Sequence, residues 1–220
     1  MSSAISVPKF QSVNDRPVGA SAKRAIDVAI AASAILLLAP LFILCCLASW
    51  LSSPGPAFFS HRRIGFGGVP FECFKFRTMV QDSDEYLRRH LASNEEAAAE
   101  WAATRKLRFD PRVTAIGAIL RKTSLDELPQ LFNVLLGDMS IVGPRPVTEE
   151  ELVRYASNAE HYLYCRPGIT GLWQVSGRSA TTYAKRVACD TYYARNWSLA
   201  LDARIVIVTI PSLLASDCAY

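Results

Sequence analysis

The sequence lacks the patterns that mark a metal-stapled or a disordered protein. Its six cysteines form no C-x-x-C pair and its three histidines lie far apart, so no zinc site is indicated. Only 20% of the 220 residues are charged and 50% are apolar, which argues against disorder. The net charge of +4 is too mild to predict a nucleic-acid partner. Cys45 and Cys46 lie inside an apolar run, which favours a reducing cytoplasm, and the length favours one domain with its own core.

A long apolar run precedes most of the charged residues. The stretch 28–51 contains 24 residues without a charge, which as a helix would be about 36 Å long. Basic residues flank both ends, Lys23 and Arg24 before the run and the stretch 61–63 after it, so the positive-inside rule gives no direction. Pro40 near the middle removes a backbone hydrogen bond and predicts a bend. Two interpretations remain open, a straight bitopic anchor, which these residues slightly favour, and a bent helix that returns to the same membrane face.

Charges at the start of this run predict an anchor. Asp27 follows Arg24 by three residues and Lys23 by four, so all three can meet on one helical face at the headgroup boundary. A second apolar stretch, 205–215, is too short and broken to cross a bilayer and is expected at the interface or in the core. The stretch 1–21 is polar, small and without periodicity, and is expected to be a flexible arm.

Two short runs after the apolar segment predict a β-hairpin. The stretches 58–64 and 69–79 have strand-like composition, and the glycine-rich stretch 65–68 joins them. Alternation along the second strand places Lys75 and Arg77 on one face, where they are candidates for binding a substrate phosphate. A solvated strand face over an aromatic core explains the same two cations without a ligand.

Helices are predicted on both sides of an Asp-Pro turn. The stretch 82–105 is charged and helix-prone, and Ser93 with Glu96 has the form of a capping box between two helices. The stretch 113–122 has apolar residues at the spacing of a short amphipathic helix. These charges are expected to form a solvated surface.

The densest chemistry lies in the stretch 121–130, which contains Asp126 and Glu127. Apolar positions at helical spacing follow, and Gly137 predicts the end of that helix. Ser124 with Glu127 would form a capping box, or Asp126 would itself be the cap, and either arrangement places Asp126 at a helix start. A carboxylate there has a purely structural explanation, because it stabilises the helix dipole by about 0.3–1 kcal/mol.

The functional interpretation makes Asp126 a nucleophile that attacks phosphorus. Backbone N–H groups at a helix start collect phosphate oxygens and would bring them to this carboxylate. Attack requires that charge repulsion be cancelled by a divalent cation and by guanidinium groups, and Glu127 and Arg121 are suitably placed. Neighbouring helical side chains diverge by about 100°, so one carboxylate would attack while the other helps to hold the metal.

Three further arginines lie in turns where a backbone can approach an anion. Arg145 stands between two prolines, whose fixed φ limits the freedom of the turn. Arg166 and Arg178 stand beside glycine turns. Each of these signals is weak alone, and together they extend the set of candidate phosphate-binding residues.

Six ordered sequence blocks resemble those of the monotopic phosphoglycosyl transferases, also called bacterial sugar transferases. The resemblance runs from residue 22 to about residue 196. The blocks are Lys-Arg-x-x-Asp (23–27), the mid-helix Pro40, Phe-Lys-Phe-Arg-Thr-Met (74–79), Leu-Arg-Lys-Thr-Ser-Leu-Asp-Glu-Leu-Pro-Gln-Leu (120–131), Gly-Asp-Met-Ser-Ile-Val-Gly-Pro-Arg-Pro (137–146) and Arg-Pro-Gly-Ile-Thr-Gly-Leu-Trp-Gln-Val-Ser-Gly-Arg (166–178).

The resemblance implies a reaction and a role for several residues. A hexose-1-phosphate would pass from a UDP-hexose to undecaprenyl phosphate with Mg²⁺, releasing UMP, as the priming step of exopolysaccharide biosynthesis. Asp126 would form an aspartyl phosphosugar, and Glu127 would be its acidic partner, with both carboxylates near the metal. Arg121 and Arg145 would bind phosphate.

The resemblance also implies a fold and a location. We expect an α+β, mainly helical monotopic membrane protein, with a re-entrant helix over 22–53 and a cytoplasmic catalytic domain over 54–220 that carries the small hairpin. The domain would face the cytoplasm at the bacterial inner membrane. The family often has serine before the mid-helix proline, where this sequence has Ala39. The implied partners are membrane lipid and downstream glycosyltransferases, and a homodimer is left open.

Three alternatives remain. The sequence blocks around 61–63 and 100–106 resemble the galactose branch, and glucose is the alternative sugar. A bitopic membrane adaptor without catalysis would use the stretch 62–63 with Lys75 and Arg77 as a basic patch for an acidic partner. A metal-dependent phosphodiesterase would use Asp126 only as a metal ligand.

Overall fold

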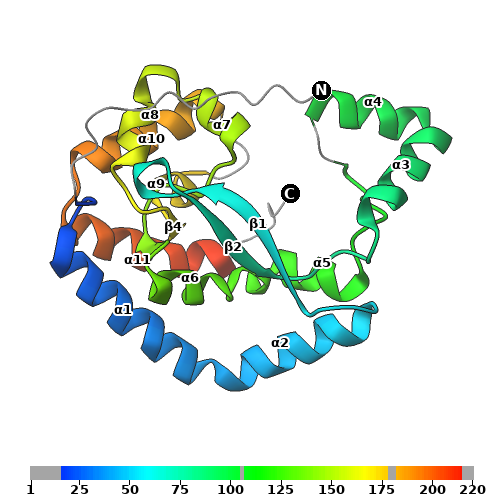
Figure 1. The fold of residues 1–220 in the computed structure, drawn as a ribbon, viewed down its shortest axis with the longest axis horizontal. Coiled ribbons are helices and arrows are strands. Elements are labelled where there is room, and N and C mark those ends of the chain that lie inside the picture. The colour runs from blue at the N-terminus through cyan, green and yellow to red at the C-terminus, as the bar shows by residue number, and fades with distance from the viewer. Residues whose placement is uncertain (1–15, 105–106, 178–181, 215–220) are drawn as a thin grey trace.

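A computed structural model describes residues 16–104, 107–177 and 182–214 (Figure 1). Over these residues the chain is mainly helical with two small two-stranded sheets, so the predicted mainly helical α+β fold is confirmed. Most of the predicted arm falls on residues 1–15, outside the described residues. The helices are α1 (Ala20–Leu37), α2 (Ala39–Ser52), α3 (Ser83–Ser93), α4 (Glu95–Thr104), α5 (Ala115–Lys122), α6 (Gln130–Leu136), α7 (Glu149–Val153), α8 (Ala159–Leu163), α9 (Leu172–Val175), α10 (Tyr183–Arg195) and α11 (Leu199–Leu214). The strands are β1 (Phe58–Ile64), β2 (Pro70–Phe76), β3 (Ser140–Val142) and β4 (Gly168–Thr170), and the 3₁₀ turns are η1 (Phe66–Gly68), η2 (Leu125–Glu127) and η3 (Ala156–Asn158).

The apolar run forms two helices, α1 and α2, that meet at a bend. Their axes are bent by 68° where Leu38 separates them, so the predicted bend is confirmed. Pro40 lies in the first turn of α2. A continuous helix would press its ring against the preceding turn, whereas a new helix start tolerates it. Among the described helices none is by itself both long and apolar enough to cross a membrane, but the bent pair meets both criteria together.

The predicted hairpin is confirmed as the antiparallel pair β1 and β2. Its register pairs Phe58 with Phe76 at one end and Ile64 with Pro70 at the other. The second strand ends at Phe76, three residues before the predicted end, and the Arg77 N–H still donates to the Ala57 carbonyl at 2.8 Å.

One local prediction is corrected by the helices that follow, and another is confirmed. Asn94, rather than Ser93, caps α4, since its Oδ1 accepts the N–H of Ala97 at 2.9 Å. The Ser93 hydroxyl instead donates to the Arg89 carbonyl of its own helix at 3.0 Å. The predicted amphipathic helix is α5, and the Thr114 hydroxyl caps it.

A second sheet, absent from the sequence predictions, joins β3 and β4 in parallel. It pairs Ser140 with Gly168 and Val142 with Thr170. Gly143 directly follows β3, and a Cβ there would lie 2.3 Å from the Arg166 carbonyl oxygen. Glycine is therefore needed where the two chain segments cross.

Charges at the start of α1 point into the domain. Lys23 and Asp27 are 7% and 3% exposed. Lys23 Nζ lies 2.6 Å from Oδ2 of Asp202 on α11, and Asp27 Oδ1 accepts hydrogen bonds from the Ser140 hydroxyl and the Ile141 N–H, both at 3.0 Å. Lys23 and Asp27 share one helical face as predicted, with Nζ 4.0 Å from Oδ1. Their predicted place at the headgroup boundary is wrong, because both charges are buried and fasten α1 to the rest of the fold.

Arg24 also links α1 to the rest of the fold. Its guanidinium donates to the carbonyl oxygens of Val134 and Leu135 at the end of α6. The last carbonyls of a helix carry partial negative charge, which favours a cation there. Of the predicted anchor residues, Lys23, Arg24 and Asp27 thus position the apolar helices relative to the domain.

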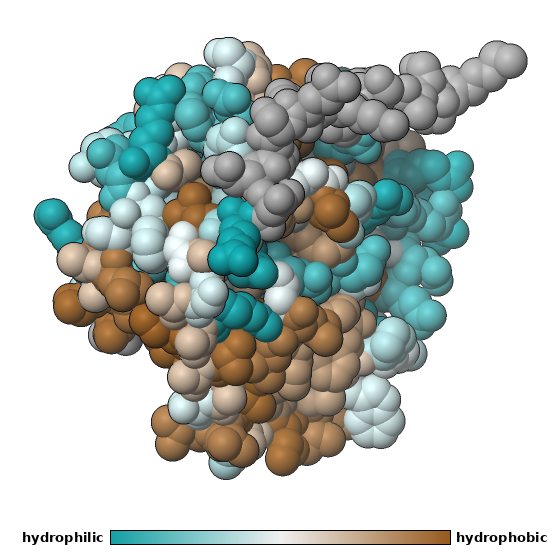
Figure 2. Space-filling model, turned by 60° about the vertical axis from the view of Figure 1, so that its left-hand side comes forward, coloured by the Kyte–Doolittle hydropathy of each residue, from teal (hydrophilic) through white to brown (hydrophobic). Residues whose placement is uncertain are grey.

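The outer faces of α1 and α2 are apolar and exposed. Figure 2 shows hydrophobic residues gathered at the lower end of the molecule, where α1 and α2 meet in Figure 1. The side chains that are at least half exposed there are Leu36, Leu37, Ile43, Leu44, Leu47, Trp50 and Leu51. α11 also has an exposed apolar face, because Ile207 and Ile210 are exposed while Ile205 is buried in the core. A surface of this size marks an interaction with another apolar phase or partner.

Candidate active site

Asp126 and Glu127 lie in a short 3₁₀ turn, η2, between α5 and α6. Ser124 precedes the turn in the left-handed conformation, with φ of 57°, and makes no side-chain cap, so neither predicted capping arrangement forms. α6 begins only after Pro129, which lacks the N–H that would continue the turn. Asp126 therefore lies in the first turn of a 3₁₀ helix, as predicted for a helix start, but the α-helix begins only at Gln130. The predicted end at Gly137 is confirmed by its φ of 99°.

Cations from separate segments converge on the acidic pair. Lys75 Nζ on β2 lies 2.7 Å from Glu127 Oε1 and 3.6 Å from Asp126 Oδ2. Arg145 Nη2, from the turn after β3, lies 3.5 Å from the same Glu127 oxygen. The fold thus brings together residues that are distant in the sequence.

Further contacts fix the elements that carry these charges. Arg121 at the end of α5 donates from Nε to the Thr78 hydroxyl at 2.9 Å. Asn133 on α6 is fully buried and ties that helix to β2, since its Oδ1 accepts the Phe74 N–H at 2.9 Å and its Nδ2 donates to the Glu72 carbonyl at 2.7 Å. Asn133 was not among the predicted site residues, although its polar side chain in an apolar helix was an available signal.

The Asp126 carboxyl group is buried among charges of both signs. It is 8% exposed, and burial raises its pKa above the ordinary value. Lys75, Arg121 and Arg145 oppose this effect, while the neighbouring Glu127 adds to it. Strongly perturbed carboxyl groups cluster at functional sites, where a shifted pKa suits a reacting group.

A small polar pocket opens beside Glu127. Three cations line it, Arg63 from β1, Lys75 from β2 and Arg145. Arg63 was not among the predicted active-site residues. The hairpin register pairs Arg63 with Phe71, which puts it on the same face as Lys75. The register that the glycine turn implies could have identified it.

The acidic pair suits a magnesium ion that also binds substrate and water, rather than a metal held by protein ligands alone. Within the described part of the chain no cluster of three or more His, Cys, Asp or Glu side chains could hold a metal alone. Mg²⁺ is usually bound by one or two carboxylates together with substrate phosphates and water. The carboxylates of Asp126 and Glu127 both face the position of Lys75 Nζ, so they can share one cation.

Two other predicted phosphate-binding residues do not join this cluster in the structure. Arg77 is 9% exposed, and its guanidinium donates to the carbonyls of Ser53 and Pro54 just after α2. Arg166 donates from Nε to the Gly137 carbonyl at 2.8 Å, and burial with the nearby Arg24 lowers its pKa. Arg178 lies outside the described residues. Arg77 and Arg166 are therefore engaged by carbonyls at helix ends.

A carboxyl pair among lysine and arginine side chains, beside a polar pocket, is the site expected of an enzyme that acts on phosphate esters or diphosphates. The family model for bacterial sugar transferases matches residues 18–216. The chain belongs to the bacterial sugar transferase family.

Several curated relatives are similar over most of this chain. The exopolysaccharide production protein ExoY of Rhizobium meliloti is 54% identical over 205 residues, which cover 93% of this chain and 91% of that protein. An undecaprenyl-phosphate galactose phosphotransferase of Salmonella typhimurium is 47% identical over 201 residues, 90% of this chain and 41% of that protein. A UDP-glucose:undecaprenyl-phosphate glucose-1-phosphate transferase of Caulobacter vibrioides is 44% identical over 206 residues, 90% of this chain and 72% of that protein.

Proposed function

We propose that this chain transfers galactose-1-phosphate from UDP-galactose to undecaprenyl phosphate, as the priming step of exopolysaccharide biosynthesis. In the first step an oxygen of the Asp126 carboxylate attacks the sugar-bearing phosphorus, the bond to the bridging oxygen breaks, and UMP leaves. In the second step a phosphate oxygen of undecaprenyl phosphate attacks the same phosphorus and releases the carboxylate. The observation that carries this proposal is the buried Asp126 carboxyl group within reach of Lys75 and beside Glu127.

The cations around the pair suit a reaction at a diphosphate. Lys75 and Arg145 would bind phosphate oxygens and offset the repulsion between a carboxylate and an anionic substrate. Arg121, at the end of α5, would stabilise the negative charge of the substrate phosphates. When bound to Asp126 and Glu127, Mg²⁺ would act as a Lewis acid on the phosphate oxygens.

We also propose that α1 and α2 form a re-entrant element at the cytoplasmic face of the bacterial inner membrane. The 68° bend and the exposed apolar side chains at its apex support this seating. Lys23 and Asp27 pair with the domain, which favours an arrangement where α1 and the domain stay on one side. UDP-sugars are cytoplasmic, so the domain would meet its donor substrate there.

Trapping the covalent intermediate tests the reaction. The full chain in detergent or lipid nanodiscs is incubated with UDP-galactose and Mg²⁺ but without undecaprenyl phosphate, and its intact mass is measured. We expect the mass of galactose phosphate to be added at Asp126, and Asp126→Asn to lose it together with at least about 1,000-fold of UMP release. Glu127→Gln is the matched neighbouring variant and should still be labelled, more slowly. UMP release without any labelled protein would favour the phosphodiesterase alternative.

Membrane topology separates the enzyme from the adaptor alternative. Reporters fused at each end of the full chain should both lie on the cytoplasmic side. Reporters on opposite sides would support a bitopic adaptor and contradict a re-entrant pair.

A panel of UDP-sugars tests the sugar. We expect UMP release to be faster with UDP-galactose than with UDP-glucose. The galactose phosphotransferase of Salmonella typhimurium, at 47% identity, supports galactose. Faster release with UDP-glucose would assign the alternative sugar and leave the mechanism unchanged.

A further inference from the structure

Arg186 on α10 is a buried cation outside the acidic pair. It is 6% exposed, and its guanidinium lies over the rings of Trp173, at 4.9 Å, and Tyr183, at 5.5 Å. Burying a charge costs free energy unless partners compensate for it. The identity of those partners therefore indicates what the residue contributes.

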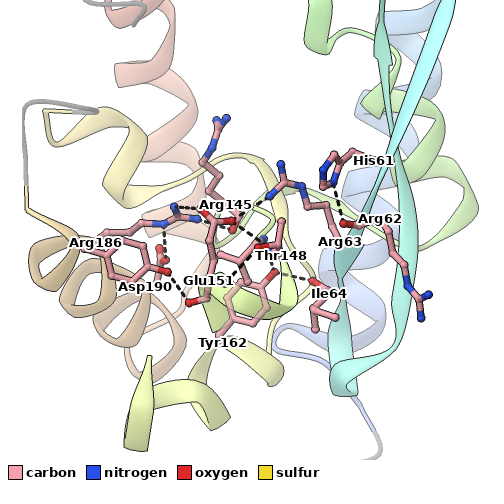
Figure 3. A network of polar contacts seen from close by, with 12 residues as sticks. His61, Arg62, Arg63, Ile64, Arg145, Thr148, Glu151, Tyr162, Arg186 and Asp190 are labelled. Atoms are coloured by element: carbon pink, nitrogen blue, oxygen red, sulfur yellow. Dashed lines mark hydrogen bonds and ion pairs between the residues drawn. The ribbon is translucent and has the colours of Figure 1, made fainter. Parts of the chain in front are cut away.

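The partners of Arg186 lead directly to the active-site turn. Its Nη2 donates to the backbone carbonyl of Arg145 at 3.2 Å. Its Nη1 lies 3.7 Å from Glu151 Oε1, and its Nε lies 3.9 Å from Asp190 Oδ2. Figure 3 shows these side chains converging from α7, α10 and the turn after β3. The only hydrogen bond from this guanidinium to backbone in the described part of the chain goes to the residue whose side chain pairs with Glu127.

Glu151 connects the same turn to the hairpin. Its Oε2 lies 3.0 Å from Arg63 Nη1 and accepts the Thr148 N–H at 3.0 Å, which closes the capping box of α7. Its other oxygen faces Arg186. The Glu151 carboxylate therefore contacts both Arg63, which lines the pocket, and the Arg186 guanidinium (Figure 3).

We propose that Arg186 is a positioning residue for phosphate binding by Arg145, an inference that rests on the proposed function. Arg145 stands between two prolines, so its turn has few free torsions, and one hydrogen bond to its carbonyl fixes much of the remaining freedom. Arg186 holds that carbonyl, and the turn then delivers the Arg145 guanidinium to the acidic pair. Arg186 itself does not touch the substrate.

A double-mutant cycle tests this coupling. The kcat/KM for UDP-galactose is measured by UMP release for wild type, Arg145→Ala, Arg186→Met and the double variant. We expect about 100-fold loss for Arg145→Ala and about 10-fold for Arg186→Met. Residues that act through one contact are not additive, so the double variant should lose no more than Arg145→Ala alone. A loss of about 1,000-fold in the double variant, the product of the two, would overturn the proposal.

A second set of variants separates positioning from folding. Val187→Ala truncates the next residue of α10, which is 9% exposed in a hydrophobic cluster, and serves as the structural control. We expect Arg186→Met to raise the KM for UDP-galactose, Val187→Ala to lower thermal stability without moving that KM, and Arg186→Lys to restore part of the loss. Equal KM changes in Arg186→Met and Val187→Ala would contradict positioning.

Failure of the proposed function has a different signature. If wild-type protein releases no UMP from any UDP-sugar and is never labelled at Asp126, the proposed function and this inference fail together. If wild type is active and labelled while the cycle is additive, only the role of Arg186 is wrong.

Discussion

Lys23 in α1 and Asp202 in α11 form a buried ion pair of 2.6 Å across 179 residues of sequence. Asp202 also accepts hydrogen bonds from the Tyr193 hydroxyl at 2.8 Å and the Trp197 indole at 3.0 Å. The carboxylate is thus supplied with donors on both oxygens, which compensates for its burial. This pair joins α1 directly to α11.

Breaking this pair should destabilise the protein strongly. We expect Lys23→Ala to lower the free energy of unfolding by about 3–5 kcal/mol, because it leaves Asp202 buried without its cation. Thermal unfolding of the full chain in detergent measures the change. Arg88→Ala, which removes an exposed ion pair with Glu85, is the control and should move the midpoint little. Equal shifts for both variants would show that the buried pair has no special role.

Lys75 should set the pH at which the enzyme becomes active. It lowers the pKa of Asp126, so Lys75→Ala should raise that pKa further. The carboxylate then forms only at higher pH, and the acid limb of kcat/KM should move upward in pH, with a loss of about 10–100-fold at neutral pH. The measurement is UMP release across pH, with the exposed Lys185→Ala as the control. An unmoved acid limb would separate Asp126 ionisation from Lys75.

Gly143 should tolerate no side chain. A Cβ there would lie 2.3 Å from the Arg166 carbonyl oxygen and 2.8 Å from the Gly168 nitrogen, both backbone atoms. We expect Gly143→Ala to cost about 3 kcal/mol or more, since the crossing of β3 and β4 must open. Gly67→Ala, at φ of +67° with open space around it, isolates the backbone cost of about 1 kcal/mol. Similar melting temperatures for the two variants would contradict the steric argument.

Asp190 should make stability depend on pH. Burial raises its pKa to about 6 from 3.8, although the Tyr155 hydroxyl and Arg186 favour its charged form. The folded protein therefore binds more protons than the unfolded chain between those values, so this contribution to stability is present at low pH and is lost as pH rises through about 6. Asp190→Asn should flatten that dependence in melting temperatures taken from pH 4 to pH 7, which is about the range of the two pKa values. Parallel curves of melting temperature against pH for wild type and Asp190→Asn would contradict this role of Asp190.

The sequence was sufficient for features fixed by local pattern. Glycines between two strand-like runs predicted the β1–β2 hairpin, and Pro40 in an apolar run predicted the bend. The proximity of Asp126 to Lys75 was not predicted, because no local rule relates a strand residue to a turn 51 positions later. In the structure, Asn133 brings the two segments together, because its side chain on α6 makes hydrogen bonds with the backbone of β2.

Features that depend on tertiary contacts could not be predicted. The three-residue strands β3 and β4 are too short to show periodicity, so their parallel pairing was missed. Arg77, Arg145 and Arg166 were all candidate phosphate-binding residues, but only the fold decides whether a guanidinium meets a carbonyl or an acidic pair. Lys23 and Asp27 were predicted to anchor the helix at the headgroup boundary, but tertiary contacts bury both of them.

The length of α1 has a consequence for the reaction. Its 18 residues span about 27 Å. Its first turns are fixed to the domain by Lys23 and Asp27, while Leu36 and Leu37 at its other end are 77% and 80% exposed. Under the proposed seating, this rigid separation sets the height of η2 above the acyl chains, and therefore how far the phosphate of a lipid acceptor must rise from the bilayer to reach the phosphorylated aspartate. One helical turn more or less would change that height by at most about 5 Å, roughly three times the length of a covalent bond.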